Sequence, residues 1–139
     1  MTEKIDSLNC VLLIDDDAAT NFYHTIILED QISELHIQSV SSANEGLEFL
    51  LCEGTFAKYP KPGIIFLDIN MPGMSGWDFL KEYNHLSADI HKRAVVVMLS
   101  TSVNPDDRER AAAIPIVKDF VNKPLTPEVF WKVVNENFN

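Results

Sequence analysis

The sequence is poor in cysteine and in positive charge, and it has no long hydrophobic run. Its only cysteines, Cys10 and Cys52, match no metal-binding spacing, so reduced thiols are expected. Eleven basic residues stand against 21 acidic ones, giving a net charge of −10. Such a chain would repel nucleic-acid phosphates, which argues against nucleic-acid binding. No stretch approaches the roughly 20 apolar residues of a membrane span, and the first residues lack a signal-peptide pattern. A cytoplasmic location is therefore expected.

What is present fits one globular domain. The chain has 139 residues, of which 46% are hydrophobic and 23% charged. This length and composition support a single buried core. The sequence therefore predicts one domain over residues 1–139, with residues 1–8 as an N-terminal extension.

Short, continuous apolar runs predict strands that are covered on both faces, as in a parallel sheet flanked by helices. The predicted strands are residues 9–14, 35–40, 63–68, 94–100 and 116–121. Helical segments separate them, so the fold class is α/β: a doubly wound, five-stranded parallel sheet. Residues 53–63 hold two prolines and two glycines and predict an irregular loop. Whether this loop is a recognition element is left open.

Hydrophobic spacing and capping residues predict where the helices lie. Residues 18–31 carry Phe22, Ile26 and Ile27 at helical spacing, and Ser42 with Glu45 has the spacing of a capping box. The third helix is expected from about Gly76 through Leu86. The last two helices are expected to begin at Asn104-Pro105 and Thr126-Pro127, where proline suits the first helical position. The apolar residues expected on the later helices are Leu47, Leu50, Leu51, Phe79, Leu80, Tyr83, Val129, Phe130, Val133, Val134 and Phe138.

Polar residues follow four of the predicted strands at their carboxyl ends. Asp15-Asp16-Asp17 follow the first strand, Asp68 ends the third, Ser100-Thr101 follow the fourth, and Lys123-Pro124 follows the fifth. The carboxyl ends of parallel strands share one edge of the sheet, where ligands bind in open α/β folds. Clustered carboxylates repel one another unless a cation lies among them. The pattern therefore predicts a divalent metal beside one reactive aspartate.

These motifs resemble a known family. The segments I-D-D-D, F-L-D-I-N-M-P-G, M-L-S-T and F-V-N-K-P are similar to the motifs of response-regulator receiver domains, the CheY-like fold of two-component signalling. The resemblance covers essentially the whole chain. It implies the strand order 2-1-3-4-5 and a stand-alone phosphorylation switch that is not an enzyme.

The resemblance also assigns roles to residues. It implies that Asp68 accepts a phosphoryl group and that Lys123 pairs with Asp68 and later with the phosphoryl oxygens. It implies a Mg²⁺ ion bound by Asp15, Asp16, Asp68 and the main-chain carbonyl of Asn70. Ser100 is the expected switch hydroxyl and Phe120 the switch aromatic. Asp17 is interpreted as a helix cap or solvated acid. The Lys123-Pro124 bond matches one that is often cis in the family.

The expected partners follow from this resemblance. A sensor histidine kinase or phosphotransfer protein would supply phosphate, and an unknown downstream protein would respond. A homodimer through the output face remains open. Ser100 replaces the commoner threonine but keeps the hydroxyl, and Thr101 is larger than the usual small residue.

Two alternatives remain at this stage. A haloacid-dehalogenase-like phosphatase also forms an aspartyl phosphate, but its D-x-D-x-[TV] motif would need Thr or Val where Ala19 stands. A degenerate receiver could bind partners without phosphate. A calcium loop starting at Asp68 fails because Phe79 occupies the position of the bidentate glutamate. The histidines at 24, 36, 85 and 91 lack zinc spacing and are expected to be surface or core polar groups.

Overall fold

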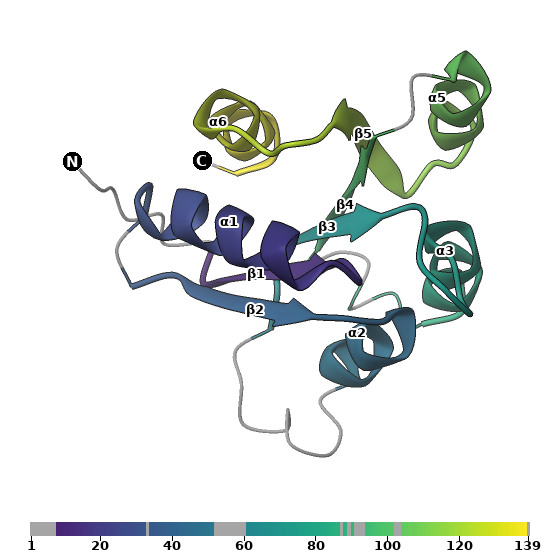
Figure 1. Cartoon of the computed structure of the whole chain (residues 1–139), viewed down its shortest axis with the longest axis horizontal. Helices are drawn as coiled ribbons and strands as arrows, with labels where there is room; N and C mark the ends of the chain where they lie inside the picture. Colours follow the sequence, from purple (N-terminus) through teal and green to yellow (C-terminus); the bar gives the residue numbers. More distant parts are fainter. Residues whose placement is uncertain are drawn as a thin grey trace.

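The computed structural model describes residues 8–32, 34–51, 61–86, 88, 90, 94–101 and 104–138. Strands and helices alternate along the chain (Figure 1). The strands are β1 (Cys10–Ile14), β2 (His36–Val40), β3 (Ile64–Asp68), β4 (Val95–Ser100) and β5 (Val117–Asn122). The helices are α1 (Ala18–Glu29), α2 (Ala43–Leu50), α3 (Gly76–Asn84), α5 (Pro105–Ala112) and α6 (Pro127–Asn137).

All five strands form one parallel sheet in the order β2-β1-β3-β4-β5. The predicted fold class and strand order are therefore confirmed, and each strand begins one residue after the predicted start. Every residue of β1 and β3 is buried, which explains why these strands read as continuous apolar runs.

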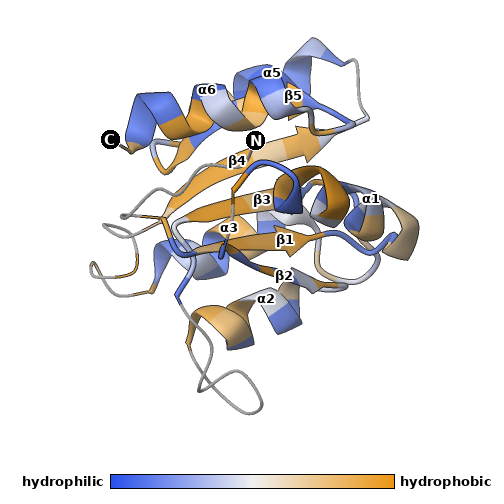
Figure 2. Ribbon diagram, turned by 90° about the vertical axis from the view of Figure 1, so that its left-hand side faces the viewer, coloured by the Kyte–Doolittle hydropathy of each residue, from blue (hydrophilic) through white to orange (hydrophobic). Residues whose placement is uncertain are grey.

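Helices cover both faces of the sheet and divide the core into two layers. Side chains of α2, α3 and α5 pack on one face, and those of α1 and α6 pack on the other. Figure 2 shows the hydrophobic central strands between these helices. Successive strand residues alternate between the layers: Leu12 and Ile14 belong to the first layer, Val11 and Leu13 to the second.

The buried face of α1 differs from the one that hydrophobic spacing indicates. Phe22 is 69% exposed and Ile26 is 49% exposed, whereas Asn21, His24 and Leu28 are buried. The helix that this spacing predicts is present, but the spacing does not identify its inward face, which holds Asn21 and His24 beside Leu28. Leu51 is also exposed, since it caps the end of α2. The apolar residues of α3 (Phe79, Leu80 and Tyr83) and of α6 (Phe130, Val133 and Val134) are buried as predicted.

Side-chain caps begin the helices. Asn104 caps α5 and Thr126 caps α6, each followed by proline, as predicted. Ser42 Oγ accepts from Glu45 N at 3.2 Å, but Glu45 Oε1 accepts from Ser41 N instead of completing the box at Ser42. A complete capping box occurs instead at the start of α3, between Ser75 and Asp78.

Some predictions concern residues at the limits of the described structure. Cys52 and most of loop 53–63 lie outside the described residues, as do residues 1–7 of the expected N-terminal extension. Leu8, the last residue of that extension, is buried in the layer formed with α1 and α6. None of the described helices combines the length and hydrophobicity that a bilayer crossing requires.

Candidate functional site

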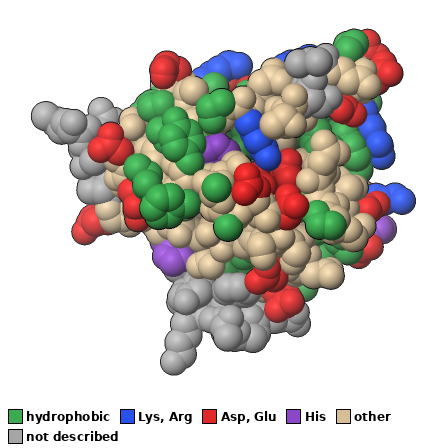
Figure 3. Space-filling view, viewed as in Figure 1, with side chains coloured by type: hydrophobic (Ala, Val, Ile, Leu, Met, Phe, Trp, Pro, Cys, Tyr) green, Lys and Arg blue, Asp and Glu red, His purple; other side chains and the backbone are tan. Residues whose placement is uncertain are grey.

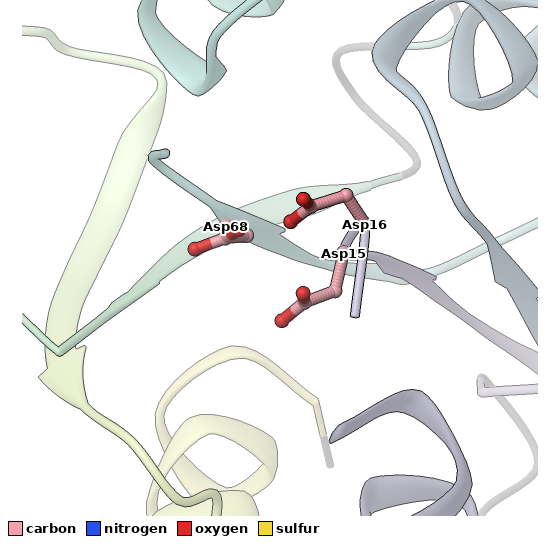
Figure 4. A group of neighbouring side chains, drawn as sticks. All are labelled: Asp15, Asp16 and Asp68. Atoms are coloured by element: carbon pink, nitrogen blue, oxygen red, sulfur yellow. The ribbon is translucent and has the colours of Figure 1, made fainter. Parts of the chain in front are cut away.

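The site lies at the carboxyl ends of the strands, where the sequence predicts it. β1 runs into Asp15 and Asp16, and β3 ends on Asp68. One carboxylate oxygen from each of these three residues lies within 4.8 Å of the others. Their side chains gather beyond the ends of β1 and β3 (Figure 4). Asp15 and Asp68 are only 4% and 6% exposed, whereas Asp16 is exposed.

One cation joins two of these acids. Lys123 Nζ lies 2.6 Å from Asp15 Oδ2 and 3.0 Å from Asp68 Oδ1. The contact with Asp68 agrees with the predicted pair, whereas the shorter contact with Asp15 was not predicted. Lys123 N also donates to Ser100 O at 2.9 Å, which fixes the lysine beside the end of β4. Figure 3 shows acidic side chains next to a basic one near the centre of this face.

The two oxygens of Asp15 are both engaged. Oδ1 accepts the backbone N–H of Asp17 at 2.9 Å, and Oδ2 accepts from Lys123. Asn21 Nδ2 donates to the carbonyl of Asp15 at 2.9 Å and to that of Val40 at 3.2 Å, so it links the ends of β1 and β2. Asp15 is therefore held in place by neighbours on three segments of the chain.

Burial and charge shift the pKa values in the cluster. Burial raises the pKa of Asp68, and the nearby acids Asp15 and Asp16 add to the increase, while the bond from Lys123 opposes it. For Lys123, burial acts to lower the pKa, but bonds to Asp15 and Asp68 outweigh it and raise the pKa. The lysine therefore stays protonated, and one positive charge faces three carboxylates.

The loop after β3 is closed by a tight contact with α3. Gly76 N donates to Ile69 O at 2.8 Å. A Cβ at Gly76 would lie 2.5 Å from the carbonyl oxygen of Asp68, so only glycine fits. Asn70 lies inside this loop with its side chain exposed, and Gly73 adopts a φ of 79°.

The other predicted site residues also lie near this edge. Ser100 ends β4 and is 1% exposed, and the Lys123-Pro124 peptide bond is cis. Phe120 is buried in β5, with the Arg108 guanidinium 5.0 Å from its ring centroid. Asp17 caps α1 by accepting from Ala19 N, which confirms its interpretation as a cap.

His24 is a buried residue whose role the sequence did not reveal. It is 1% exposed, and its Nε2 accepts the backbone N–H of Leu125 at 3.1 Å. This bond ties α1 to the segment just after Lys123-Pro124. Burial lowers the pKa of His24 below its ordinary value of 6.5, because the charged imidazolium is poorly solvated there.

We expect His24 to make the protein less stable in acid. The unfolded chain binds a proton near pH 6.5 that the folded chain accepts only at lower pH, so the free energy of unfolding falls as the pH drops through 6.5. The fall is at most about 1.4 kcal/mol per pH unit. His24→Gln keeps an acceptor for Leu125 N–H and should remove this part of the pH dependence.

Urea unfolding of both proteins at about pH 7 and about pH 5.5 measures the effect. Equal losses of stability in the two proteins would show that His24 is not held neutral in the folded state.

Comparison with known proteins agrees with this geometry. The family model for the response regulator receiver domain matches residues 11–135 of this chain. A crystal structure of a two-component response regulator from Cytophaga hutchinsonii is 34% identical, with a TM-score of 0.82 over 93% of this chain and 96% of that chain.

Two further relatives are response regulators of different size. Response regulator Rcp1 of Synechocystis is 28% identical over 107 residues, 77% of this chain and 71% of that protein. The Mn²⁺-bound form of response regulator Rcp1 superimposes with a TM-score of 0.72 at 24% identity, over 92% of this chain and 90% of that chain. The cyclic di-GMP phosphodiesterase response regulator RpfG of Xanthomonas campestris is 26% identical over 126 residues, 91% of this chain but 31% of that protein.

Receiver domains are generally switches without enzymatic output of their own, and the phosphatase alternative is not favoured. The chain belongs to the family of response regulator receiver domains of two-component signalling.

Proposed function

We propose that this receiver accepts a phosphoryl group on Asp68 in a Mg²⁺-dependent reaction and thereby changes its binding surface. The observation that carries the proposal is the placement of Asp68, a buried strand-end carboxylate with one oxygen on Lys123 and two other acids within 4.8 Å. The ion pair with Lys123 is made by Oδ1, so Oδ2 is the carboxylate oxygen that this contact leaves open. That oxygen is available as the nucleophile.

The acidic cluster fits a divalent cation. Three carboxylates share one ammonium group, that of Lys123, so two negative charges remain to be balanced. Oxygens on opposite sides of Mg²⁺ lie about 4.2 Å apart, since each bond is about 2.1 Å. The carboxylate oxygens of Asp15, Asp16 and Asp68 lie within 4.8 Å of one another, which is close to that separation.

The hydrogen bonds of the three acids support a distinction between direct and water-mediated metal ligands. Both oxygens of Asp15 are occupied by Asp17 N–H and Lys123, so Asp15 is assigned to the metal through a water molecule. Asp16 makes no hydrogen bond to any residue of the described segments and is assigned as a direct ligand with Asp68. The carbonyl of Asn70, two residues beyond Asp68, is assigned as the main-chain ligand. When bound, Mg²⁺ supplies charge neutralisation for the anionic donor and nucleophile.

The chemical step is a balanced transfer. Asp68 Oδ2 forms a bond to phosphorus as the bond from phosphorus to the donor breaks, and the donor leaves with that electron pair. A phosphohistidine donor leaves as histidine, and acetyl phosphate leaves as acetate. Lys123, fixed by its N–H bond to Ser100 O, pairs with the phosphoryl oxygens. Hydrolysis of the acyl phosphate by water restores the carboxylate.

The response is assigned to β4 and β5. Ser100 and Phe120 lie on adjacent strands, and Phe120 pairs in register with Met98. Phe120 is already buried in this structure, and Arg108 donates to its carbonyl at 3.1 Å. A bond from the Ser100 hydroxyl to a phosphoryl oxygen would shift the end of β4, and with it this contact between β5 and α5.

The phosphodonor is expected to approach over α1. Phe22, Tyr23 and Ile26 are all exposed on this helix, whose N-terminal cap, Asp17, follows directly on Asp16. Exposed apolar groups of this size commonly mark protein contacts. A histidine kinase or phosphotransfer protein docking there would reach Asp68.

Incubation with acetyl phosphate and Mg²⁺, followed by intact mass spectrometry, tests the proposal. One added phosphoryl group that maps to the peptide containing Asp68 is the expected result. Catalytic hydrolysis of phosphate esters without such an adduct would favour a phosphatase. Failure to label in the presence of saturating Mg²⁺ would favour a receiver that works without phosphate.

Asp16→Asn should weaken Mg²⁺ binding by about tenfold or more, because it removes a charged direct ligand. Asp17→Asn is the matched control, since Asp17 caps α1 and asparagine is an equally good cap. Isothermal titration with MgCl₂ compares the two variants with the parent protein. Equal affinities in Asp16→Asn and the parent would remove Asp16 from the ligand set.

A further inference from the structure

A pocket lies on the side of the sheet covered by α2, α3 and α5. Its volume is about 330 Å³, and it shares no residue with the acidic cluster. Helices α2 and α3 pack directly against each other, whereas the pocket lies between α3 and α5. Figure 1 shows α3 and α5 on the same side of the sheet.

The lining of this α3–α5 pocket is largely apolar. It includes Trp77 and Leu80 from α3 and Ile114 and Ile116 from the segment between α5 and β5. Of these, Trp77, Ile114 and Ile116 are only partly buried, although they pack on the core. The volume lies at the lower end of the range for ligand sites, which suits one or two side chains better than a large cofactor.

Two cations line the same pocket. Lys81 and Arg110 are both exposed, and the Arg110 guanidinium lies 4.2 Å from the centroid of the Trp77 ring. No acidic residue is among the described residues that line the pocket. Neither cation forms an ion pair with a carboxylate of the described segments. Asp78 lies near enough to Lys81 and Arg110 for both to lower its pKa, but it does not line the pocket, so the charges that border the pocket itself are positive.

Each cation also lies in the last turn of its helix, where it balances the helix dipole. That role explains a basic residue at each position. It does not explain why both border an apolar hollow beside an indole ring. A ligand with an apolar group and an adjacent negative charge would use all of these features together.

We propose that the α3–α5 pocket binds an acidic segment of a partner protein. An aromatic or branched side chain of that segment enters between Trp77 and Ile114, and a neighbouring carboxylate pairs with Arg110 or Lys81. Arginine suits this role because its planar guanidinium can bind a carboxylate while it stacks on an aromatic ring. The site is independent of Asp68 chemistry, so it can be tested on the unphosphorylated chain.

The probe is the peptide acetyl-Glu-Phe-Asp-Leu-amide, titrated into ¹⁵N-labelled protein and followed by NMR. It should shift the Trp77 indole N–H and the amides of Ile114 and Ile116, with a dissociation constant on the order of 1 mM or below. The Trp131 indole is an internal control, because it donates to Gln31 Oε1 at 3.0 Å on the other face of the sheet. The control peptide acetyl-Lys-Phe-Lys-Leu-amide has lysines in place of the two acidic residues. It should bind at least about fivefold more weakly, because its charges would repel Arg110 and Lys81.

Arg110→Gln should weaken binding of the acidic peptide by about fivefold, whereas Lys118→Gln, which removes the same charge outside the pocket, should not. Ala113→Leu fills the pocket from an exposed position and should abolish binding without unfolding the protein. Equal binding of the two peptides, shifts elsewhere on the molecule, or no effect of Ala113→Leu would each overturn the proposal. A dimer that Arg110→Gln dissociates, seen by sedimentation, would replace the partner with a second copy of this chain and would also overturn it.

Discussion

Asp68→Asn is expected to abolish phosphorylation while the protein stays folded. The amide cannot act as the attacking oxygen, so the labelled fraction after acetyl phosphate and Mg²⁺ treatment should fall by about 100-fold or more. Stability should be unchanged or higher by up to about 1 kcal/mol. The reason is that burial and the neighbouring acids raise the pKa of Asp68, so its charged form is costly in the folded state. Lys123 retains its 2.6 Å contact with Asp15 in this variant.

Intact mass spectrometry measures labelling, and thermal unfolding measures stability. Asp17→Asn carries the same chemical change at a cap outside the cluster and should label like the parent. Persistent labelling of Asp68→Asn at the parent level would place the acceptor elsewhere. Loss of labelling together with unfolding would not be the expected pattern and would contradict the stability argument.

Gly76→Ala is expected to cause the largest loss of stability of the substitutions considered. The new Cβ would lie 2.5 Å from Asp68 O and 2.9 Å from Ile69 Cα. Both are backbone atoms of the strand end and its loop, so no side chain can rotate to make room. The free energy of unfolding should fall by about 3 kcal/mol or more. Any folded fraction should also bind Mg²⁺ less well, because relief of the clash displaces Asp68.

Gly46→Ala is the matched control. Gly46 is also a buried helical glycine, but its Cβ would meet the Cδ1 of Ile14 at 2.6 Å, the end of a flexible side chain. The gain in helix propensity of up to about 1 kcal/mol offsets part of the repacking cost. Urea unfolding should therefore show a much smaller loss than for Gly76→Ala. A larger loss in Gly46→Ala would mean that the approach of α3 to Asp68 is not the tighter constraint.

The sheet and the acidic site could be predicted because each depends on a local pattern. Runs such as I-I-F-L before Asp68 are apolar throughout because β3 is covered on both faces. Acids that directly follow such runs must meet at the carboxyl edge of a parallel sheet. This is why Asp15, Asp16 and Asp68 could be grouped although more than fifty residues separate them.

The packing of α1 could not be predicted in the same way. Apolar spacing marks Phe22 and Ile26, but the inward face is set by polar groups that satisfy backbone atoms on other segments. Asn21 donates hydrogen bonds to the carbonyls of Asp15 and Val40, and His24 accepts one from the backbone N–H of Leu125. These partners are distant in sequence. The one available signal was the spacing of Asn21, His24 and Leu28 along a single helical face.

The role of Gly76 and the contact of Lys123 with Asp15 could not be predicted from the sequence, because both depend on residues that are distant along the chain. A glycine at the start of a helix has many uses, and only the three-dimensional approach of Asp68 O shows which one applies. The motif pairs Lys123 with Asp68. The additional contact of Lys123 with Asp15 depends on where β5 lies relative to β1, which the motif does not show.

The strand order places β2 and β5 at the two edges of the sheet, and no further strand of the described residues pairs with their outer sides. Such edges can recruit further strands and promote aggregation. Here both strands are short, and β5 carries Lys118 and Asp119, the latter paired with Lys132 of α6. An added strand would have to bury or displace these charges. Addition of a strand beside β5 is therefore disfavoured, whereas β2, with the sequence H-I-Q-S-V, has no such pair of charges.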